Sequence, residues 1–296
     1  MSGVDTDTQQ EIGIDNPGMG PTGRPLTDFP VPPPIEQHGP ARIIAIVNQK
    51  GGVGKTTTSI NLGAALAEYG RRVLLVDFDP QGALSVGLGI NPHSVEQSVY
   101  SLLMNDGVDP HDVVHSTDIE RIDVLPANID LSAAEVQLVG EVGRERALDR
   151  SLQKLAPEYD VVLIDCQPSL GLLTVNALSA AHGVIIPLET EFFALRGVAL
   201  LVESIEKVQA RINPALEIDG ILATMFAPRT LHSREVVERV VEAFGDKVFE
   251  TVINRTVKFP DASVAAEPIT SFASSHRGAE AYRALARELI ARGGAP

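Results

Sequence analysis

The sequence predicts an α/β fold: a single domain whose mainly parallel sheet is doubly wound, with helices on both faces. Apolar segments of strand length alternate with helical segments between residues 42 and 291. Nearly continuous apolar strands are typical of a parallel sheet that is buried on both sides. A glycine-rich segment at 48–57 separates the first strand from the first helix, and carboxylates follow two strands at the edge where such sheets bind ligands.

The first half of the chain supplies four of the expected strands and three of the helices. Residues 42–47 are a β-branched apolar run, and the Ala- and Leu-rich helix expected at 59–69 contains one glycine and no proline. A long helix is expected from Ser132 to about Leu155, closed by Pro157. The other elements of this half are strands at 72–76, 122–125 and 161–164 and a helix at 95–104.

The second half continues the alternation of strands and helices. The helix expected at 194–212 ends at Asn213-Pro214, and the one at 233–244 carries its apolar side chains on one face. A last helix at 278–291 buries apolar residues that include Tyr282. The other expected elements are a helix at 173–181 and strands at 183–187, 220–225 and 248–253.

Residues 1–40 differ from the remainder and predict a disordered tail ahead of one folded domain at 41–296. They hold eight prolines and six glycines without a hydrophobic period, and their six acidic residues face only Arg24. Such a segment cannot bury enough apolar surface to fold alone. The alternative for residues 29–34 is an extended proline-rich motif that docks a partner.

The composition limits the classes of function. The net charge of −15 argues against binding nucleic acid through overall charge, so such binding needs a local basic patch. No run approaches the roughly 18 apolar residues of a membrane span, and the polar, acidic first residues argue against a signal peptide. The single cysteine, Cys166, excludes an internal disulfide. We therefore expect a cytoplasmic protein without a membrane partner.

The segment 48–57, NQKGGVGKTT, has the strand–loop–helix context that a phosphate-binding loop requires. Glycines let the backbone turn its N–H groups toward an anion, and the following helix N-terminus adds partial positive charge. Lys55 would contact the β- and γ-phosphates of ATP, and the Thr56 hydroxyl would bind Mg²⁺. The residues expected to hold the nucleotide are Lys50, Gly51, Gly52, Val53, Gly54, Lys55, Thr56 and Thr57.

The loop departs from the common G-x-x-x-x-G-K-[ST] pattern at two positions. Gln49 replaces the first glycine, and a second lysine, Lys50, follows it. If Lys55 occupies the phosphates of its own loop, Lys50 has little access to them but can reach a nucleotide in a facing subunit. The pattern K-G-G-x-G-K-T-[ST] resembles the deviant Walker A loop of the ParA/MinD superfamily of P-loop ATPases.

Carboxylates lie at the C-terminal ends of two expected strands. Asp77 and Asp79 end the second strand, and Asp165 ends a later one, so parallel pairing predicts that they lie beside the phosphate loop. One carboxylate there can hold Mg²⁺, and another can orient the attacking water. A cap or turn role is the alternative for a single aspartate. We expect the metal ligands to be Thr56, Asp79 and Asp165.

Three longer motifs resemble those of the ParA/Soj partitioning ATPases. They are KGGVGKTT at 50–57, LLVDFDPQG at 74–82 and DVVLIDCQPSLG at 160–171. Shorter similarities occur at 126–131, 222–230 and 275–282, so the resemblance covers about residues 42 to 291. It implies a homodimer that sandwiches ATP, slow hydrolysis stimulated by a ParB-like partner, sequence-nonspecific DNA binding by the ATP dimer, and a location on the nucleoid.

The resemblance also implies roles for individual residues. Lys50 would act across the dimer, Asp79 would position the hydrolytic water, and Asp165 would be the Walker B acid. The expected catalytic residues are thus Lys50, Lys55 and Asp79. The family's DNA-contacting bases fall at Arg229, Arg255 and Lys258.

The expected DNA patch has a simpler alternative. Residues 229–258 hold six bases and five acids, which is nearly neutral, so an ordinary salt-bridged surface remains open. The chain also departs from the family in this region, with Asn254 at a usual proline and Glu267 where a lysine is common.

Other members of the superfamily supply the alternative functions. A ParA-like ATPase that positions a protein cargo would carry the same loop and the same acids. A MinD-like membrane ATPase would end in an amphipathic helix with bulky apolar residues free for lipid. This chain ends ARGGAP, after a helix whose apolar residues we expect in the core.

Overall fold

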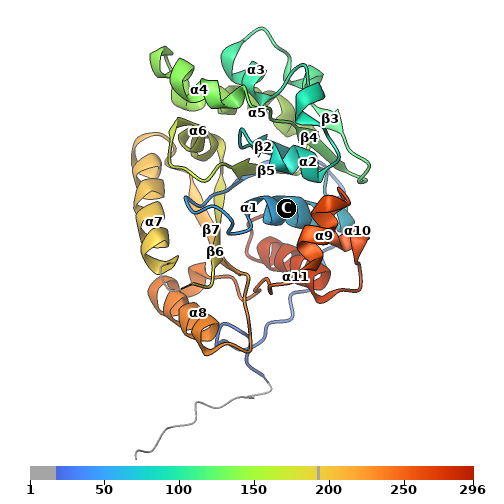
Figure 1. Cartoon of the computed structure of the whole chain (residues 1–296), viewed down its shortest axis with the longest axis vertical. Helices are drawn as coiled ribbons and strands as arrows, with labels where there is room; N and C mark the ends of the chain where they lie inside the picture. Colours follow the sequence, from blue (N-terminus) through green and yellow to red (C-terminus); the bar gives the residue numbers. More distant parts are fainter. Residues whose placement is uncertain (1–17, 192–193) are drawn as a thin grey trace, which may run out of the picture.

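The computed structural model describes residues 18–191 and 194–296, and within them one sheet of seven strands forms the centre of the molecule (Figure 1). Its strand order is β3-β4-β2-β5-β1-β6-β7, and all neighbours are parallel except β3 and β4. The strands are β1 (Arg42–Ile46), β2 (Val73–Phe78), β3 (His115–Ser116), β4 (Ile122–Leu125), β5 (Val161–Cys166), β6 (Gly183–Glu189) and β7 (Glu217–Thr224). The predicted α/β class with a mainly parallel sheet is confirmed.

Helices cover both faces of the sheet, as a doubly wound fold requires (Figure 1). One face packs against α3 (Val99–Met104), α4 (Leu131–Gln137), α5 (Ala147–Leu155), α6 (Leu172–Ala180), α7 (Ala194–Arg211) and α8 (Leu231–Phe244). The other face carries α1 (Lys55–Glu68), α2 (Ala83–Gly87), α9 (Lys258–Val264), α10 (Ile269–Phe272) and α11 (Arg277–Ala291).

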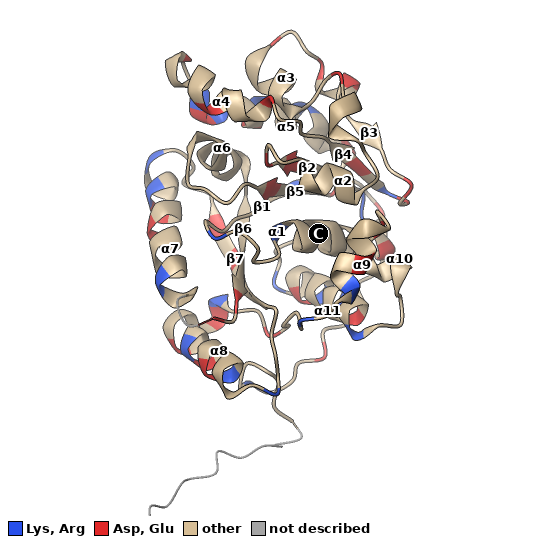
Figure 2. Ribbon diagram, viewed as in Figure 1, with Lys and Arg blue, Asp and Glu red and all other residues tan. Residues whose placement is uncertain are grey.

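The inner strands are apolar because helices cover them on both sides. Every residue of β2 and β5 is buried, and the strands alternate their side chains between two separate apolar clusters. Figure 2 shows the charged residues mainly on the outer helices and at strand ends, with few along the strands. None of the helices in the described part of the chain combines the length and apolar character needed to cross a bilayer.

Three expected helices differ from the observed ones by about one turn or by an interruption, whereas the bounds of the others shift by only one or two residues. The first begins at Lys55 instead of Ser59, because Gly54 adopts the left-handed conformation just before it. The one expected at 95–104 begins at Val99, after a capping box formed by Ser98 and Ser101. The one expected at 132–155 divides into α4 and α5, and the interruption contains Gly143, whose φ is 69°.

The strand expected at 248–253 is wrong. Val248 and Asn254 form only isolated bridges to β7 and the residues after it. Between them, the N–H groups of Glu250 and Thr251 donate to the buried Glu288 carboxylate of α11 at 2.7 and 2.9 Å. The Phe249 and Ile253 N–H groups still donate to the β7 carbonyls of Ile221 and Ala223, but the Thr251 N–H between them goes to Glu288, so no continuous ladder forms.

The part of the predicted tail that the structure describes, residues 18–40, lies against the domain. Arg24 donates to the carbonyls of Gly245 and Val248, and the Pro33 carbonyl accepts from Arg71 at 2.8 Å. The buried carboxylate of Asp160 accepts from the backbone N–H of Gly39 at 3.0 Å. The predicted disorder of residues 1–17 lies outside the described residues, and the predicted boundary at residue 40 stays a prediction.

Candidate nucleotide site

The glycine-rich loop follows β1 and leads directly into α1. Gly52 and Gly54 have φ angles of 77° and 86°, a left-handed conformation that favours glycine. The Val53 carbonyl accepts from the Thr224 hydroxyl at 2.9 Å, which joins the loop to the end of β7. The Asn48 side chain accepts from the Lys50 N–H at 2.9 Å and so closes the other side of the turn.

Lys55 lies inside this loop, as the motif predicts. Its side chain is buried, and Nζ donates to the Lys50 carbonyl at 3.0 Å. Burial lowers the pKa of the Lys55 ammonium, and the nearby charge of Asp165 opposes this effect. A phosphate group bound in the loop would place a full negative charge beside the buried Lys55 ammonium and so stabilise its charged form.

Asp165 and Asp77 lie side by side at the ends of β5 and β2, where they are in register. Asp165 accepts from Ser59 Oγ at 3.2 Å and lies beside the Thr56 hydroxyl, and within the described part of the chain its second oxygen, Oδ2, is buried without a hydrogen-bond partner. Burial first, and then the charge of Asp77, raises the pKa of Asp165 to about 7. An unpartnered buried carboxylate oxygen beside a threonine hydroxyl fits a hard cation such as Mg²⁺. The structure therefore brings together Thr56 and Asp165, two of the three expected metal ligands.

The two aspartates at the end of β2 differ in what they can do. Asp77 accepts from the Ser85 N–H at 2.8 Å and from its hydroxyl at 2.7 Å, and burial raises the pKa of Asp77 to about 6. Asp79 is only partly buried, and its carboxylate accepts from the Gln81 N–H at 3.0 Å. Asp77 is thus committed to holding the start of α2, whereas Asp79 remains accessible to a water molecule.

Lys50 forms ion pairs within its own chain. Its Nζ lies 2.9 Å from Glu189 and 2.6 Å from Glu191, and the pKa of Lys50 is raised by its hydrogen bonds to these two carboxylates. Glu189 also lies 3.2 Å from Arg255. The sequence interpretation missed both glutamates, although Glu189 ends the apolar strand β6 and Glu191 follows it, so the same strand-end argument would have found them.

A hollow of about 420 Å³ lies next to the phosphate loop and has room for a nucleoside. Gly54 and Thr57 form its loop side, and Phe259 and Tyr282 form an aromatic side. The Tyr282 hydroxyl lies 3.3 Å from that of Thr58 in α1. The sequence interpretation placed Tyr282 in the core, where it is buried, but missed that it also lines this hollow.

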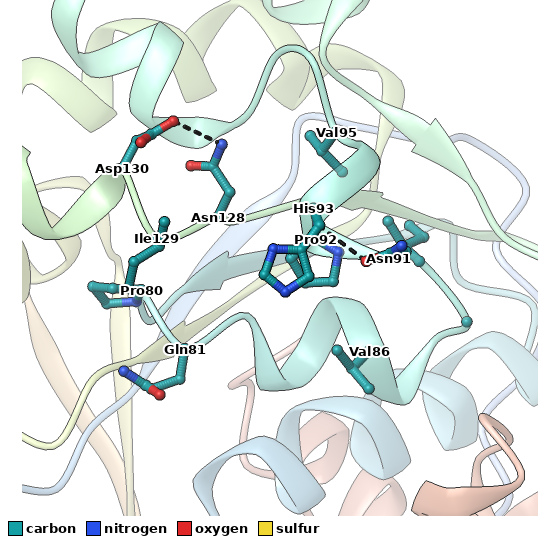
Figure 3. Close-up of a pocket in the computed structure, with 12 residues that line it drawn as sticks. Pro80, Gln81, Val86, Asn91, Pro92, His93, Val95, Asn128, Ile129 and Asp130 are labelled. Carbon is teal, nitrogen blue, oxygen red and sulfur yellow. Dashed lines mark hydrogen bonds between the residues drawn. The ribbon is translucent and has the colours of Figure 1, made fainter.

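A larger hollow of about 840 Å³ begins just after Asp79, between α2 and the loop before α4 (Figure 3). Pro80, Gln81 and His93 contribute to its lining, and the Asn128 amide donates to Asp130 at 3.1 Å across one side. No residue of the phosphate loop lines it. The smaller hollow, which does contain loop residues, is therefore the candidate site for the nucleotide.

The expected DNA-contacting residues divide into two groups. Arg229 and Arg255 line one further hollow of about 440 Å³. Lys258 is not part of that lining. Its Nζ lies 3.1 Å from Asp261 and 5.9 Å from the centroid of the Phe272 ring, so it is engaged on α9.

Comparisons with known proteins agree with this geometry. Residues 41–218 match a protein-family model described as an AAA domain. The chain is 60% identical over 94% of its length to an uncharacterised protein of Mycobacterium tuberculosis, Rv1708, covering 87% of that protein. It is 49% identical over 85% of its length to the sporulation initiation inhibitor protein Soj of Bacillus subtilis, covering 99% of Soj.

A solved structure shows the same fold with a nucleotide. It is the cobyrinic acid a,c-diamide synthase of Mycobacterium smegmatis with a bound ATP analogue and magnesium. That protein is 45% identical, with a TM-score of 0.77, and the alignment covers 84% of this chain and 94% of that one. With Soj covered almost completely at 49% identity, and with the loop and strand-end acids arranged as described, the chain belongs to the ParA/Soj family of P-loop ATPases.

Proposed function

We propose that this protein is an ATPase that dimerises with ATP and Mg²⁺, hydrolyses ATP slowly and acts in partitioning chromosomal or plasmid DNA. The observation that carries the proposal is the arrangement around Asp165. Its unpartnered oxygen, the Thr56 hydroxyl and the buried Lys55 ammonium lie together at the mouth of the phosphate loop. This donor set suits a nucleotide triphosphate with its cation.

The residues of the site divide the work of phosphoryl transfer. The backbone of Gly51 to Thr57 cradles the phosphates, and Lys55 neutralises charge on the β- and γ-phosphates. Thr56, Asp79 and Asp165 would hold Mg²⁺, which would supply further neutralisation of the phosphates. Asp79, the accessible acid at the end of β2, would also orient the attacking water. The protein thus acts by positioning and electrostatics.

Lys50 serves the facing subunit in this proposal. Its side chain is 47% exposed, and its ammonium points to Glu189 and Glu191 instead of into its own loop. In an ATP dimer, Lys50 would leave these carboxylates and approach the γ-phosphate in the partner's loop. A triphosphate carries more charge there than a diphosphate, so ATP favours the dimer.

The remaining parts of the function rest on the family relationship. The ATP dimer binds DNA without regard to sequence through Arg229, Arg255 and Lys258, and a ParB-like protein stimulates hydrolysis. The protein acts on the nucleoid in the cytoplasm, without a membrane partner. A ParA-like ATPase that moves a protein cargo is the alternative, and such a protein need not hold DNA through this patch.

The decisive experiment measures DNA binding by an Asp79→Ala variant, in which ATP stays bound and intact. Light scattering follows the mass of the protein with and without ATP, and fluorescence anisotropy follows a long duplex of random sequence. We expect a dimer, and DNA binding, only with ATP. A dimer that leaves the duplex unbound at about 50 mM salt, where phosphate contacts are strongest, would favour the cargo alternative. An ATP-independent dimer would contradict the proposed switch.

A further inference from the structure

The hollow that contains Arg229 and Arg255 has a third arginine, Arg277, to which the sequence interpretation gave no role. The three side chains come from separate segments, which are the turn after β7, the segment after residue 253 and the first residue of α11. Among the residues that the structure describes, the lining contains no carboxylate. The residues of this lining, hereafter the arginine hollow, are Phe226, Ala227, Pro228, Arg229, Asn254, Arg255, Thr256, His276, Arg277 and Gly278.

Arg277 differs from the other arginines of the same helix. Arg283 and Arg287 form ion pairs with Glu68 and Glu280 at 2.6 and 2.9 Å. Within residues 18–191 and 194–296, neither Arg277 nor Arg229 forms an ion pair. Although the chain has 39 acidic and only 24 basic residues, two arginines that the described residues leave without a carboxylate partner line one hollow.

The backbone fixes two sides of the arginine hollow. The Phe226 N–H donates to the Ile253 carbonyl, and the Arg255 N–H donates to the Phe226 carbonyl, both at 3.0 Å. On the third side, His276 caps α11 by accepting from the Gly278 N–H at 2.9 Å. The start of this 15-residue helix adds partial positive charge on the side from which Arg277 projects.

The arginine hollow also shares a wall with the hollow of about 420 Å³ beside the phosphate loop, hereafter the nucleoside hollow. Asn254, Arg255 and Thr256 line both of them. A ligand of the arginine hollow would therefore contact the same three residues as a nucleotide in the nucleoside hollow. Lys258, by contrast, is paired with Asp261 and lies outside this wall.

We infer that the arginine hollow holds a backbone phosphate of duplex DNA and that Arg277 is one of its binding residues. The inference rests on the proposed function and deepens it. Guanidinium groups bind phosphate oxygens in a planar, bidentate way. Three guanidinium groups around one hollow can contact one phosphate and the adjacent phosphates of the same DNA strand. The contact involves no base edge, so it adds affinity for any sequence.

The test compares salt dependence across variants of the full chain held as a dimer by a nonhydrolysable ATP analogue. Each lost phosphate contact reduces the slope of log K against log salt by about 0.9. Arg277→Ala removes one contact from each subunit, so the slope should become shallower by about 2. Arg277→Lys keeps the charge and should keep the slope. The matched control is Arg211→Ala, at the far end of α7, which should bind DNA like the unchanged protein.

The results separate this inference from the proposed function. A slope that Arg277→Ala leaves unchanged would overturn the inference while DNA binding by the protein stands. An equal loss of slope in Arg277→Lys would also overturn it, because the side chain would then be acting through the fold of α11. If the unchanged protein dimerises with the ATP analogue but binds no duplex, both the inference and the DNA-binding function fail. Light scattering on each variant shows that the dimer is present.

Discussion

The Nζ atom of Lys50 lies 2.9 Å from Oε2 of Glu189 in the same chain, and the other oxygen of that carboxylate lies 3.2 Å from Arg255. One glutamate thus holds both the lysine proposed to act across the dimer and an arginine proposed to bind DNA. Both functions require these cations to leave Glu189, or to share it. We regard Glu189 as the residue that restrains the two activities in the monomer.

Replacing Glu189 by Gln should therefore strengthen both ATP-dependent dimerisation and DNA binding. Lys50 and Arg255 are largely exposed, so each pair is worth roughly 0.2–1 kcal/mol and the affinities should rise by no more than about fivefold. Anisotropy and light scattering in the presence of ATP measure the two effects. The matched control is Glu206→Gln on α7, and weaker DNA binding by Glu189→Gln would show that the carboxylate supports the site.

Lys50→Ala should abolish the ATP-induced dimer and leave nucleotide binding by the monomer nearly unchanged. The side chain lies outside its own phosphate cradle, where only its backbone carbonyl contacts Lys55. Light scattering with ATP and calorimetric titration of the monomer give the two readouts. Lys154→Ala, on an exposed part of α5, is the control. A Lys50→Ala protein that still dimerises with ATP would exclude the trans role.

Asp79→Ala should retain ATP but reduce its turnover on the order of 10²-fold or more, as expected when a positioned acid–base group is lost. Asp79 is the accessible carboxylate at the end of β2, and its removal leaves the Asp165–Thr56 contact in place. Release of phosphate measures turnover, and retention of a labelled nucleotide measures binding. Full hydrolysis by this variant would show that another group positions the water.

The nucleotide-free protein should become less stable as the pH rises from about 4 to about 7. An unfolded aspartate titrates near 3.9, whereas burial and the neighbouring Asp77 raise the pKa of Asp165 to about 7 in the folded protein. Between these two values, Asp165 keeps its proton in the folded protein but has lost it in the unfolded chain. The free energy of unfolding therefore falls as the pH rises and Asp165 loses this proton. Urea unfolding at several pH values measures the slope, which Asp165→Asn should reduce.

Magnesium with ATP should reverse this trend, because a cation at Asp165 favours the ionised carboxylate. Stabilisation by Mg²⁺ and ATP together should therefore be larger at pH 8 than at pH 6. The control is Asp130→Asn, at an exposed residue beside the larger hollow. Equal stabilisation at the two pH values would argue against a cation bound directly by Asp165.

The sequence predicted the sheet and the phosphate loop well because both depend on local patterns. Buried parallel strands are apolar throughout, and the left-handed turns at Gly52 and Gly54 require glycine in the loop itself. The pairing of Asp77 with Asp165 followed from the rule that parallel strands end at one edge. The strands and the loop themselves need no knowledge of contacts between distant segments.

The features that the sequence did not predict depend on contacts between distant segments. Residues 248–253 are apolar enough for a strand, but Glu288, far away in α11, takes the N–H groups of Glu250 and Thr251. Proline-rich composition predicts a disordered tail, and it gives no sign of the contact that the Pro33 carbonyl makes with Arg71. Arg277 reads as an ordinary helix residue until the fold places it beside Arg229.

The position of Tyr282 gives the protein an optical reporter of its own. The chain contains no tryptophan and four tyrosines, and this one is buried at the edge of the nucleoside hollow, in edge-to-face contact with Phe259 at 5.7 Å between ring centroids. Intrinsic ultraviolet emission therefore comes from tyrosine alone, and a purine entering the hollow would quench part of it. A single Phe259→Trp substitution would introduce one tryptophan at this hollow, in a chain that otherwise has none. Its fluorescence, at a longer wavelength than that of tyrosine, would report nucleotide exchange in real time without a label.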